Sequence, residues 1–101
     1  MEIIKQLVTK IDDELEDAEK YAINALECKE SDPASAELYY KLANEEIGHM
    51  NLLHARVVAM IEAYKKTNGE PPEEMLWRYN YTHKKYIAHR ASVKGILSLY
   101  K

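Results

Sequence analysis

Apolar residues recur at every third or fourth position along most of the chain, which is the spacing of one face of an α-helix. In the N-terminal third this apolar stripe is unbroken. Its members are Ile4, Val8, Ile11, Leu15, Ala18, Ala22 and Ala25, with Leu7 and Leu26 at its edges. The pattern predicts one long amphipathic helix at the start of the chain.

Two further stripes with helical spacing follow, and polar residues interrupt both of them. Glu46 fills a gap in the middle stripe, whereas His83 and Arg90 interrupt the C-terminal stripe. The middle stripe comprises Tyr39, Leu42, Met50, Leu53, Val57, Met60, Ile61 and Tyr64, and the C-terminal stripe comprises Leu76, Tyr79, His83, Tyr86, Ile87, Val93 and Leu97. Both segments are predicted to be helices whose core-facing sides carry polar groups in need of partners.

Residues that start or end helices occur at only two places. At the first, Asp32 suits a helix N-cap and Pro33 suits the first helical position. At the second, Gly69 suits a left-handed C-terminal cap and Pro72 suits the start of the next helix. The predicted helices cover residues of about 2–29, 33–67 and 72–100. The sequence therefore predicts an all-α fold, with residues 1–101 forming a single domain of three long helices in an elongated bundle.

The composition narrows the class of protein further. Three Gly and three Pro are too few for the turns of an all-β chain. No run of 18 apolar residues is present, and residues 1–10 lack the apolar segment of a signal peptide, so we expect a cytoplasmic protein without a membrane partner. The lone Cys28 excludes an intramolecular disulfide and a thiolate metal site.

Charge is distributed unevenly along the chain. Residues 1–70 carry 15 acidic and 8 basic side chains, whereas residues 71–101 carry 2 acidic and 6 basic side chains. Because overall acidity opposes phosphate binding, we expect the basic segment to pack on the acidic one or on a partner copy rather than on nucleic acid. Lys84, Lys85 and Arg90 are the expected basic partners of the acidic first helix, and His89 is expected to point away.

Glu46 and His49 form the first candidate for chemistry. Helical spacing places the Glu46 carboxylate within the apolar face, where it must be paired, protonated or bound to a metal ion. His49 lies three residues on, within about 5–6 Å on the same face, and Glu-x-x-His is a spacing of metal ligands. The alternative is an ordinary ion pair between Glu46 and a base such as Arg90.

The first helix supplies a second carboxylate. Its acidic run from Asp12 to Glu19 is mostly a solvated face. Glu14, however, lies between Ile11 and Ala18, and Glu19 flanks the stripe on its other side. Either carboxylate is placed to lean into the core.

These residues resemble the first half of the ferritin-like di-metal carboxylate bundle, as in bacterioferritin, rubrerythrin and the half-sized encapsulated ferritins. The resemblance covers about residues 4–65, and its most specific stretch runs from Tyr39 to His49; the segments DAEKYA and ANEEIGHMNLLH are also similar to short ferritin-like proteins of bacterial prophages. It implies Glu14, Glu46 and His49 as metal ligands, with Tyr21 or Tyr39 beside them. Iron is the implied metal, with manganese or zinc as alternatives, and Fe(II) oxidation is the implied activity.

The chain departs from that family in its third helix. A complete di-metal site needs a further Glu and a second Glu-x-x-His, but the third helix has only Glu73 and Glu74, in its first turn. Either two copies pair and each supplies half of the site, or the site is vestigial. Glu19 and His54 are weaker candidate ligands. In the vestigial case the chain is a non-catalytic helical dimerisation module whose basic C-terminal helix docks on a partner.

Overall fold

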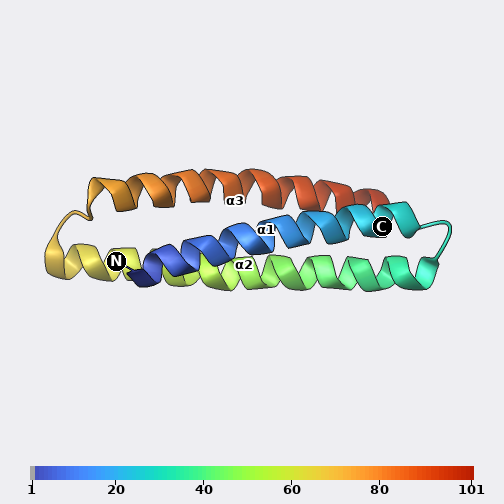
Figure 1. The fold of residues 1–101 in the computed structure, drawn as a ribbon, viewed down its shortest axis with the longest axis horizontal. Coiled ribbons are helices and arrows are strands. Elements are labelled where there is room, and N and C mark those ends of the chain that lie inside the picture. Colours follow the sequence, from blue (N-terminus) through green and yellow to red (C-terminus); the bar gives the residue numbers. More distant parts are fainter. Residues whose placement is uncertain (1) are drawn as a thin grey trace.

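The computed structural model describes residues 2–101 as three long α-helices: α1 (Glu2–Cys28), α2 (Pro33–Asn68) and α3 (Glu73–Tyr100). α2 runs antiparallel to both α1 and α3, which therefore run in the same direction (Figure 1). The molecule is a rod of 55 × 17 × 17 Å. The predicted all-α class, the three helices and their approximate bounds are confirmed.

The first helix boundary has the predicted capping interactions. The Ser35 backbone N–H donates to Asp32 Oδ1 at 3.2 Å, the Ser35 hydroxyl donates to Asp32 Oδ2 at 2.7 Å, and Pro33 occupies the first turn. These bonds stabilise the charged carboxylate and lower the pKa of Asp32.

The second boundary uses the only glycine with a positive φ among residues 2–101. Gly69 adopts a φ of 78°, and its N–H donates to the Lys65 carbonyl at 3.2 Å, which closes the last turn of α2. A side chain would strain this backbone conformation. Gly69 thus caps α2 as predicted, but its ψ of −150° is not that of the predicted left-handed cap.

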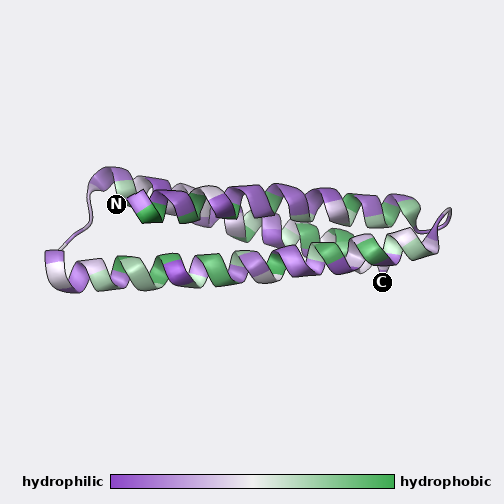
Figure 2. Ribbon diagram, turned by 60° about the horizontal axis from the view of Figure 1, so that its bottom comes forward, coloured by the Kyte–Doolittle hydropathy of each residue, from purple (hydrophilic) through white to green (hydrophobic). Residues whose placement is uncertain are grey.

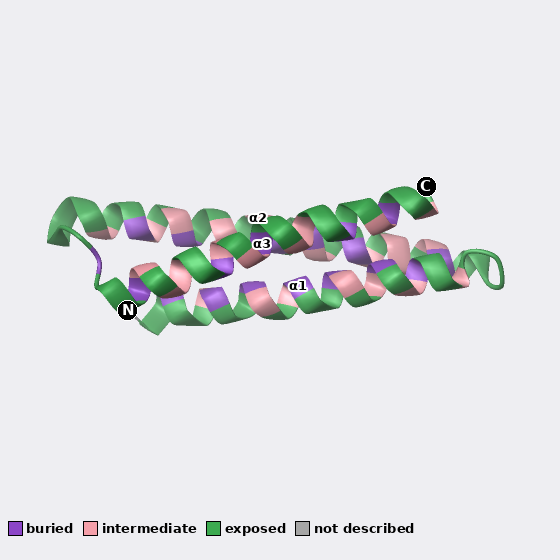
Figure 3. Cartoon of the chain, turned by 90° about the horizontal axis from the view of Figure 1, so that it is seen from above, coloured by how far each residue is buried: buried purple, intermediate pink, exposed green. Residues whose placement is uncertain are grey.

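The core lies along the length of α1, which packs on both other helices, and buried residues lie on the helix faces that meet (Figure 3). All seven residues of the predicted α1 stripe are buried. The buried residues of the other two helices are Ala36, Ala43, Ile47, Met50, Val57 and Ile61 in α2, and Met75, Thr82, Tyr86, Val93 and Leu97 in α3.

The predicted stripes of α2 and α3 are thus partly wrong. Leu42 and Leu53 are only half-buried, whereas the small side chains of Ala36 and Ala43 are fully buried. Ile87 is 51 % exposed. Exposed apolar residues therefore occur on α2 and α3, among them Leu52, Ile87 and Leu99, and hydrophobic residues recur along the length of α2 (Figure 2).

Polar bridges connect α3 to α1. Lys85 Nζ lies 3.1 Å from Asp12 Oδ1, and His89 Nδ1 donates to Glu19 Oε2 at 3.1 Å. The hydrogen bond and charge of Asp12 raise the pKa of Lys85. The expected contact between basic α3 and acidic α1 is confirmed at Lys85, but His89 points toward α1, contrary to expectation. None of the helices within residues 2–101 has the length and apolarity to cross a bilayer.

Candidate metal centre

Glu14, Glu46 and His49 meet between α1 and α2, near the middle of the rod. Their ligand atoms all lie within 4.8 Å of one another. His49 Nδ1 is 3.6 Å from Glu14 Oε2 and 3.7 Å from Glu46 Oε1. The spacing within α2 aligns Glu46 with His49, and the antiparallel packing of α1 brings Glu14 alongside them. The structure therefore brings together the three residues that the sequence singles out as ligands.

The two carboxylates are partly buried with no lysine or arginine beside them in the part of the chain that the structure describes. The Glu14 and Glu46 side chains are 24 % and 16 % exposed, and Oε2 of each is buried without a hydrogen-bond partner. Within residues 2–101, neither carboxylate is within 4.0 Å of a lysine or arginine nitrogen. Partial burial of two neighbouring negative charges is unfavourable, and a cation between them relieves both the repulsion and the lost hydration.

Arg90 does not supply that countercharge within the chain. Its guanidinium lies over the Tyr86 ring, 5.9 Å from the ring centroid, and its Nε atom is buried without a partner. The interpretation of Glu46 as half of an intramolecular ion pair with Arg90 is therefore wrong.

The donor set suits a first-row divalent metal ion. Two carboxylate oxygens and an imidazole nitrogen fit Fe(II), Mn(II) and Zn(II), with bond lengths of about 2.0–2.2 Å. Ligand atoms around one such ion lie about 3.0–3.5 Å apart. The two distances to His49 Nδ1, 3.6 and 3.7 Å, exceed this range only slightly. The group as a whole spans up to 4.8 Å, so side-chain rotations that bring the ligand atoms closer together would be needed to close it around an ion.

The group opens toward solvent on the side of the bundle away from α3. The His49 side chain is 54 % exposed. Half-buried apolar side chains of both helices, among them Leu7 on α1 and Leu42 and Leu53 on α2, lie on the same side by helical spacing. Among residues 2–101, no side chain of α3 forms an ion pair with the three ligands, which thus sit in a partly apolar and partly exposed face of α1 and α2.

The predicted neighbours of the site are only partly placed there. The Tyr21 and Tyr39 rings stack across α1 and α2 with centroids 6.2 Å apart. Each lies seven residues, or about 10.5 Å along its helix, from the closer ligand. Within residues 2–101, neither tyrosine hydroxyl donates a hydrogen bond to the three ligands. They border the site without touching it.

The weaker candidate ligands lie elsewhere. Glu19 accepts the hydrogen bond from His89, and His54 Nε2 lies 2.8 Å from His83 Nδ1. Both therefore face α3. His54 follows His49 by five residues, which turns it about 140° around the helix from the ligand face. Sequence reasoning missed these two contacts with α3, because they depend on how α3 is aligned with the other helices.

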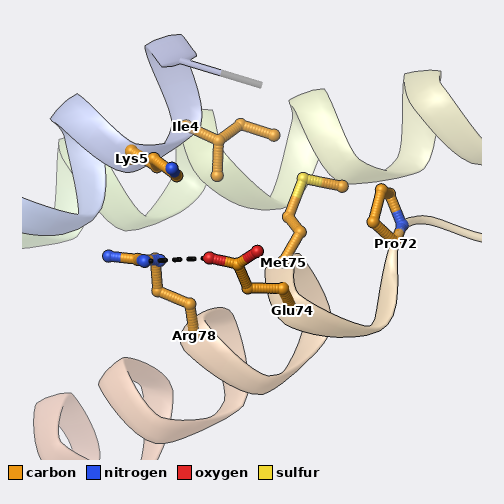
Figure 4. A pocket seen from close by; sticks show the side chains of 6 residues that line it. All are labelled: Ile4, Lys5, Pro72, Glu74, Met75 and Arg78. Carbon is orange, nitrogen blue, oxygen red and sulfur yellow. Dashed lines mark hydrogen bonds and ion pairs between the residues drawn. The ribbon is translucent and has the colours of Figure 1, made fainter.

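A separate pocket of about 170 Å³ lies near the start of α1 and α3 (Figure 4). It is lined by Ile4, Lys5, Pro72, Glu74, Met75 and Arg78. Arg78 and Glu74 pair with each other at 3.4 Å. This pocket contains none of the three candidate ligands, so it belongs to the packing of the helix ends rather than to the metal centre.

Comparison with known proteins adds no relative: no protein-family model, curated protein or solved structure matches the chain. The resemblance to ferritin-like bundles thus depends on the sequence motifs quoted above.

Proposed function

We propose that this chain is a ferritin-like metal-binding protein in which two copies pair through their α1–α2 faces and form a non-haem di-iron site between them. The observation that carries the proposal is the convergence of Glu14, Glu46 and His49, with two buried carboxylate oxygens that have no partner. Such oxygens are costly unless a cation or a hydrogen-bond donor reaches them.

Ligand stoichiometry supports a dimer. A di-metal carboxylate bundle uses four carboxylates and two histidines from four helices. One chain supplies two carboxylates and one histidine. The acids of α3, Glu73 and Glu74, are exposed in its first turn and cannot complete the set. A two-fold axis beside the open His49 would repeat the half-site and cover the half-buried leucines around it.

The donors also define the chemistry that the site would support. Glu14 and Glu46 would bind the metal ions through their oxygens, and neutral His49 would supply nitrogen. Bound iron would supply redox chemistry with oxygen or peroxide, and anionic oxygen donors favour the ferric state, which fits oxidation of Fe(II). Manganese and zinc fit the same donors and are distinguished by the experiment below.

The test compares two adjacent glutamates. Glu46→Gln removes a ligand charge, whereas Glu45→Gln changes an exposed neighbour in the same turn. We expect wild type and Glu45→Gln, equilibrated anaerobically with Fe(II), Mn(II) or Zn(II), to bind about one ion per chain and to melt at a higher temperature than the metal-free protein. Glu46→Gln should do neither. Absence of bound metal in wild type, with an unchanged melting temperature, would overturn the proposal.

A second candidate function is a non-catalytic dimerisation module with a vestigial site. The outer side of α3 favours it, because Trp77 and Tyr81 are 68 % and 57 % exposed and stack on each other with centroids 5.6 Å apart. An exposed aromatic pair on a basic helix suits docking on a partner protein. This function predicts a dimer that forms equally well in chelator and in Glu46→Gln. Cytoplasmic location and the lack of a nucleic-acid partner stay predictions from the sequence.

A further inference from the structure

α2 and α3 are joined mainly by long side chains, because their backbones approach each other at few points. At the middle of this seam, His54 Nε2 on α2 lies 2.8 Å from His83 Nδ1 on α3. The Tyr86 hydroxyl, also on α3, donates to Asn51 Oδ1 on α2 beside this pair. These two hydrogen bonds hold the central part of α3 to α2.

The two imidazoles meet edge to edge. Their ring centroids are 5.0 Å apart and their planes differ by 24°. That separation equals the nitrogen–nitrogen distance plus the two ring radii, so the rings lie end to end rather than face to face. The Tyr86 ring stacks on His54 with its plane only 8° away and its centroid at 4.5 Å. The acceptor lone pair is thus directed along the N–H of the other ring.

Proton occupancy decides whether this contact attracts or repels. A hydrogen bond between two imidazole nitrogens needs one N–H donor and one bare acceptor. One added proton can go to the outer nitrogen of the donor ring without breaking the bond. A second added proton puts an N–H on both facing nitrogens, which removes the acceptor and sets two positive charges against each other.

The surroundings offer no compensating negative charge. Burial, followed by the charges of His83 and Arg90, lowers the pKa of His54. On α1, Asp12 is paired with Lys85 and Glu19 with His89. On α2 the group beside the pair is the neutral amide of Asn51. On α3 the Tyr79 ring stacks on both imidazoles, and its pKa is raised by burial and then by the charge of Glu62. Within residues 2–101, no carboxylate forms an ion pair with either His54 or His83.

We propose that His54 and His83 form a pH-dependent contact, which holds α3 to α2 at neutral pH and breaks in mild acid. α3 stays attached to α1, because Lys85 remains paired with Asp12 and His89 keeps its hydrogen bond to Glu19. The movement therefore opens the α2–α3 seam and leaves the α1–α2 hairpin intact. This device lies on the side of α2 opposite the candidate metal centre and does not depend on that site.

The test measures the distance across the seam. In a Cys28→Ser background, spin labels at Ala55→Cys on α2 and Lys84→Cys on α3, both exposed positions, report the separation by pulsed electron spin resonance. Dilution with unlabelled protein removes distances between copies. We expect the distance distribution to lengthen and broaden between pH 7.5 and about pH 5. Labels at Lys20→Cys and Lys41→Cys, across the α1–α2 hairpin, should report no change.

A doubly neutral variant tests the role of the imidazoles. His54→Gln with His83→Gln keeps donors and acceptors in the seam but cannot be protonated in this pH range. Its seam distance should be the same at both pH values. If this variant does not fold, titration of the wild-type imidazoles by NMR replaces it, and the distance change must coincide with the second of the two protonation steps of the pair. An unchanged wild-type distance, or equal opening in the doubly neutral variant, would overturn the proposal.

Discussion

Replacement of Glu46 by leucine should change stability in opposite directions without and with metal. In metal-free protein, Glu46→Leu removes a carboxylate whose Oε2 is buried without a partner and whose charge faces Glu14 within the same 4.8 Å group. An unsatisfied buried polar group costs about 1–3 kcal/mol, and charge repulsion at this distance adds about 1–3 kcal/mol at an effective dielectric constant of 20–80. Leucine and glutamate have similar helix propensities, so the backbone contributes little.

We therefore expect metal-free Glu46→Leu to be more stable than wild type by about 1–3 kcal/mol after relaxation of the neighbouring side chains. For a domain of this size, each kcal/mol raises the melting temperature by about 4–8 °C. With metal at about 100 times its dissociation constant, wild type gains about 2.7 kcal/mol that the variant cannot gain. With metal, wild type should then be as stable as Glu46→Leu or more stable.

The assay is urea denaturation followed by circular dichroism, in chelator and in saturating Fe(II), Mn(II) or Zn(II), at one fixed protein concentration. Glu45→Leu, at an exposed position, serves as the matched control and should stay within about 0.5 kcal/mol of wild type in chelator. A clear loss of stability in metal-free Glu46→Leu would refute the reasoning, because it would show that the carboxylate already has a partner. Equal stabilisation of both proteins by metal would place the ion elsewhere.

Three further predictions concern the fold. Because the pKa of His54 is lowered in the folded state, the unfolded chain binds more protons. The free energy of unfolding should therefore be highest above the ordinary pKa of 6.5 and fall as the pH drops below it. Urea midpoints at pH 7.5 and about pH 5.5 check this, and His54→Gln should reduce the difference between them. Leu15→Ala opens a cavity at a residue that is 0 % exposed, and should cost about 2–5 kcal/mol in the same measurement. Gly69→Ala meets no atom within 4 Å but must adopt a φ of 78° with a ψ of −150°, so it should cost about 1–3 kcal/mol. Gly95→Ala, at an exposed position of α3, should be neutral or stabilising.

Much of the fold follows from local sequence rules. The α1 stripe predicts burial correctly because α1 lies between two helices and uses one continuous face for both. The rules fail where burial depends on neighbours. Ala36 and Ala43 are buried although they lie outside the predicted stripe, and Thr82 is buried while Ile87 is exposed, because burial in α2 and α3 depends on which side of the helix meets a neighbour.

The candidate site was predictable to a similar extent. The spacing of Glu46 and His49 fixes their proximity within one helix, and resemblance to a known bundle supplied Glu14. Contacts between helices, such as those of His54 with His83 and of His89 with Glu19, depend on the alignment of whole helices. No local pattern encodes that alignment, so these contacts could be seen only in three dimensions.

The central claim is that metal binding and pairing of two chains occur together. Native mass spectrometry of the metal-loaded protein tests it most directly, because it reports chain number and metal content of the same particle. The account predicts that metal is carried by dimers with two ions each, and that Glu46→Gln carries none. A monomer that retains metal, or a Glu46→Gln dimer that still holds two ions, would contradict it.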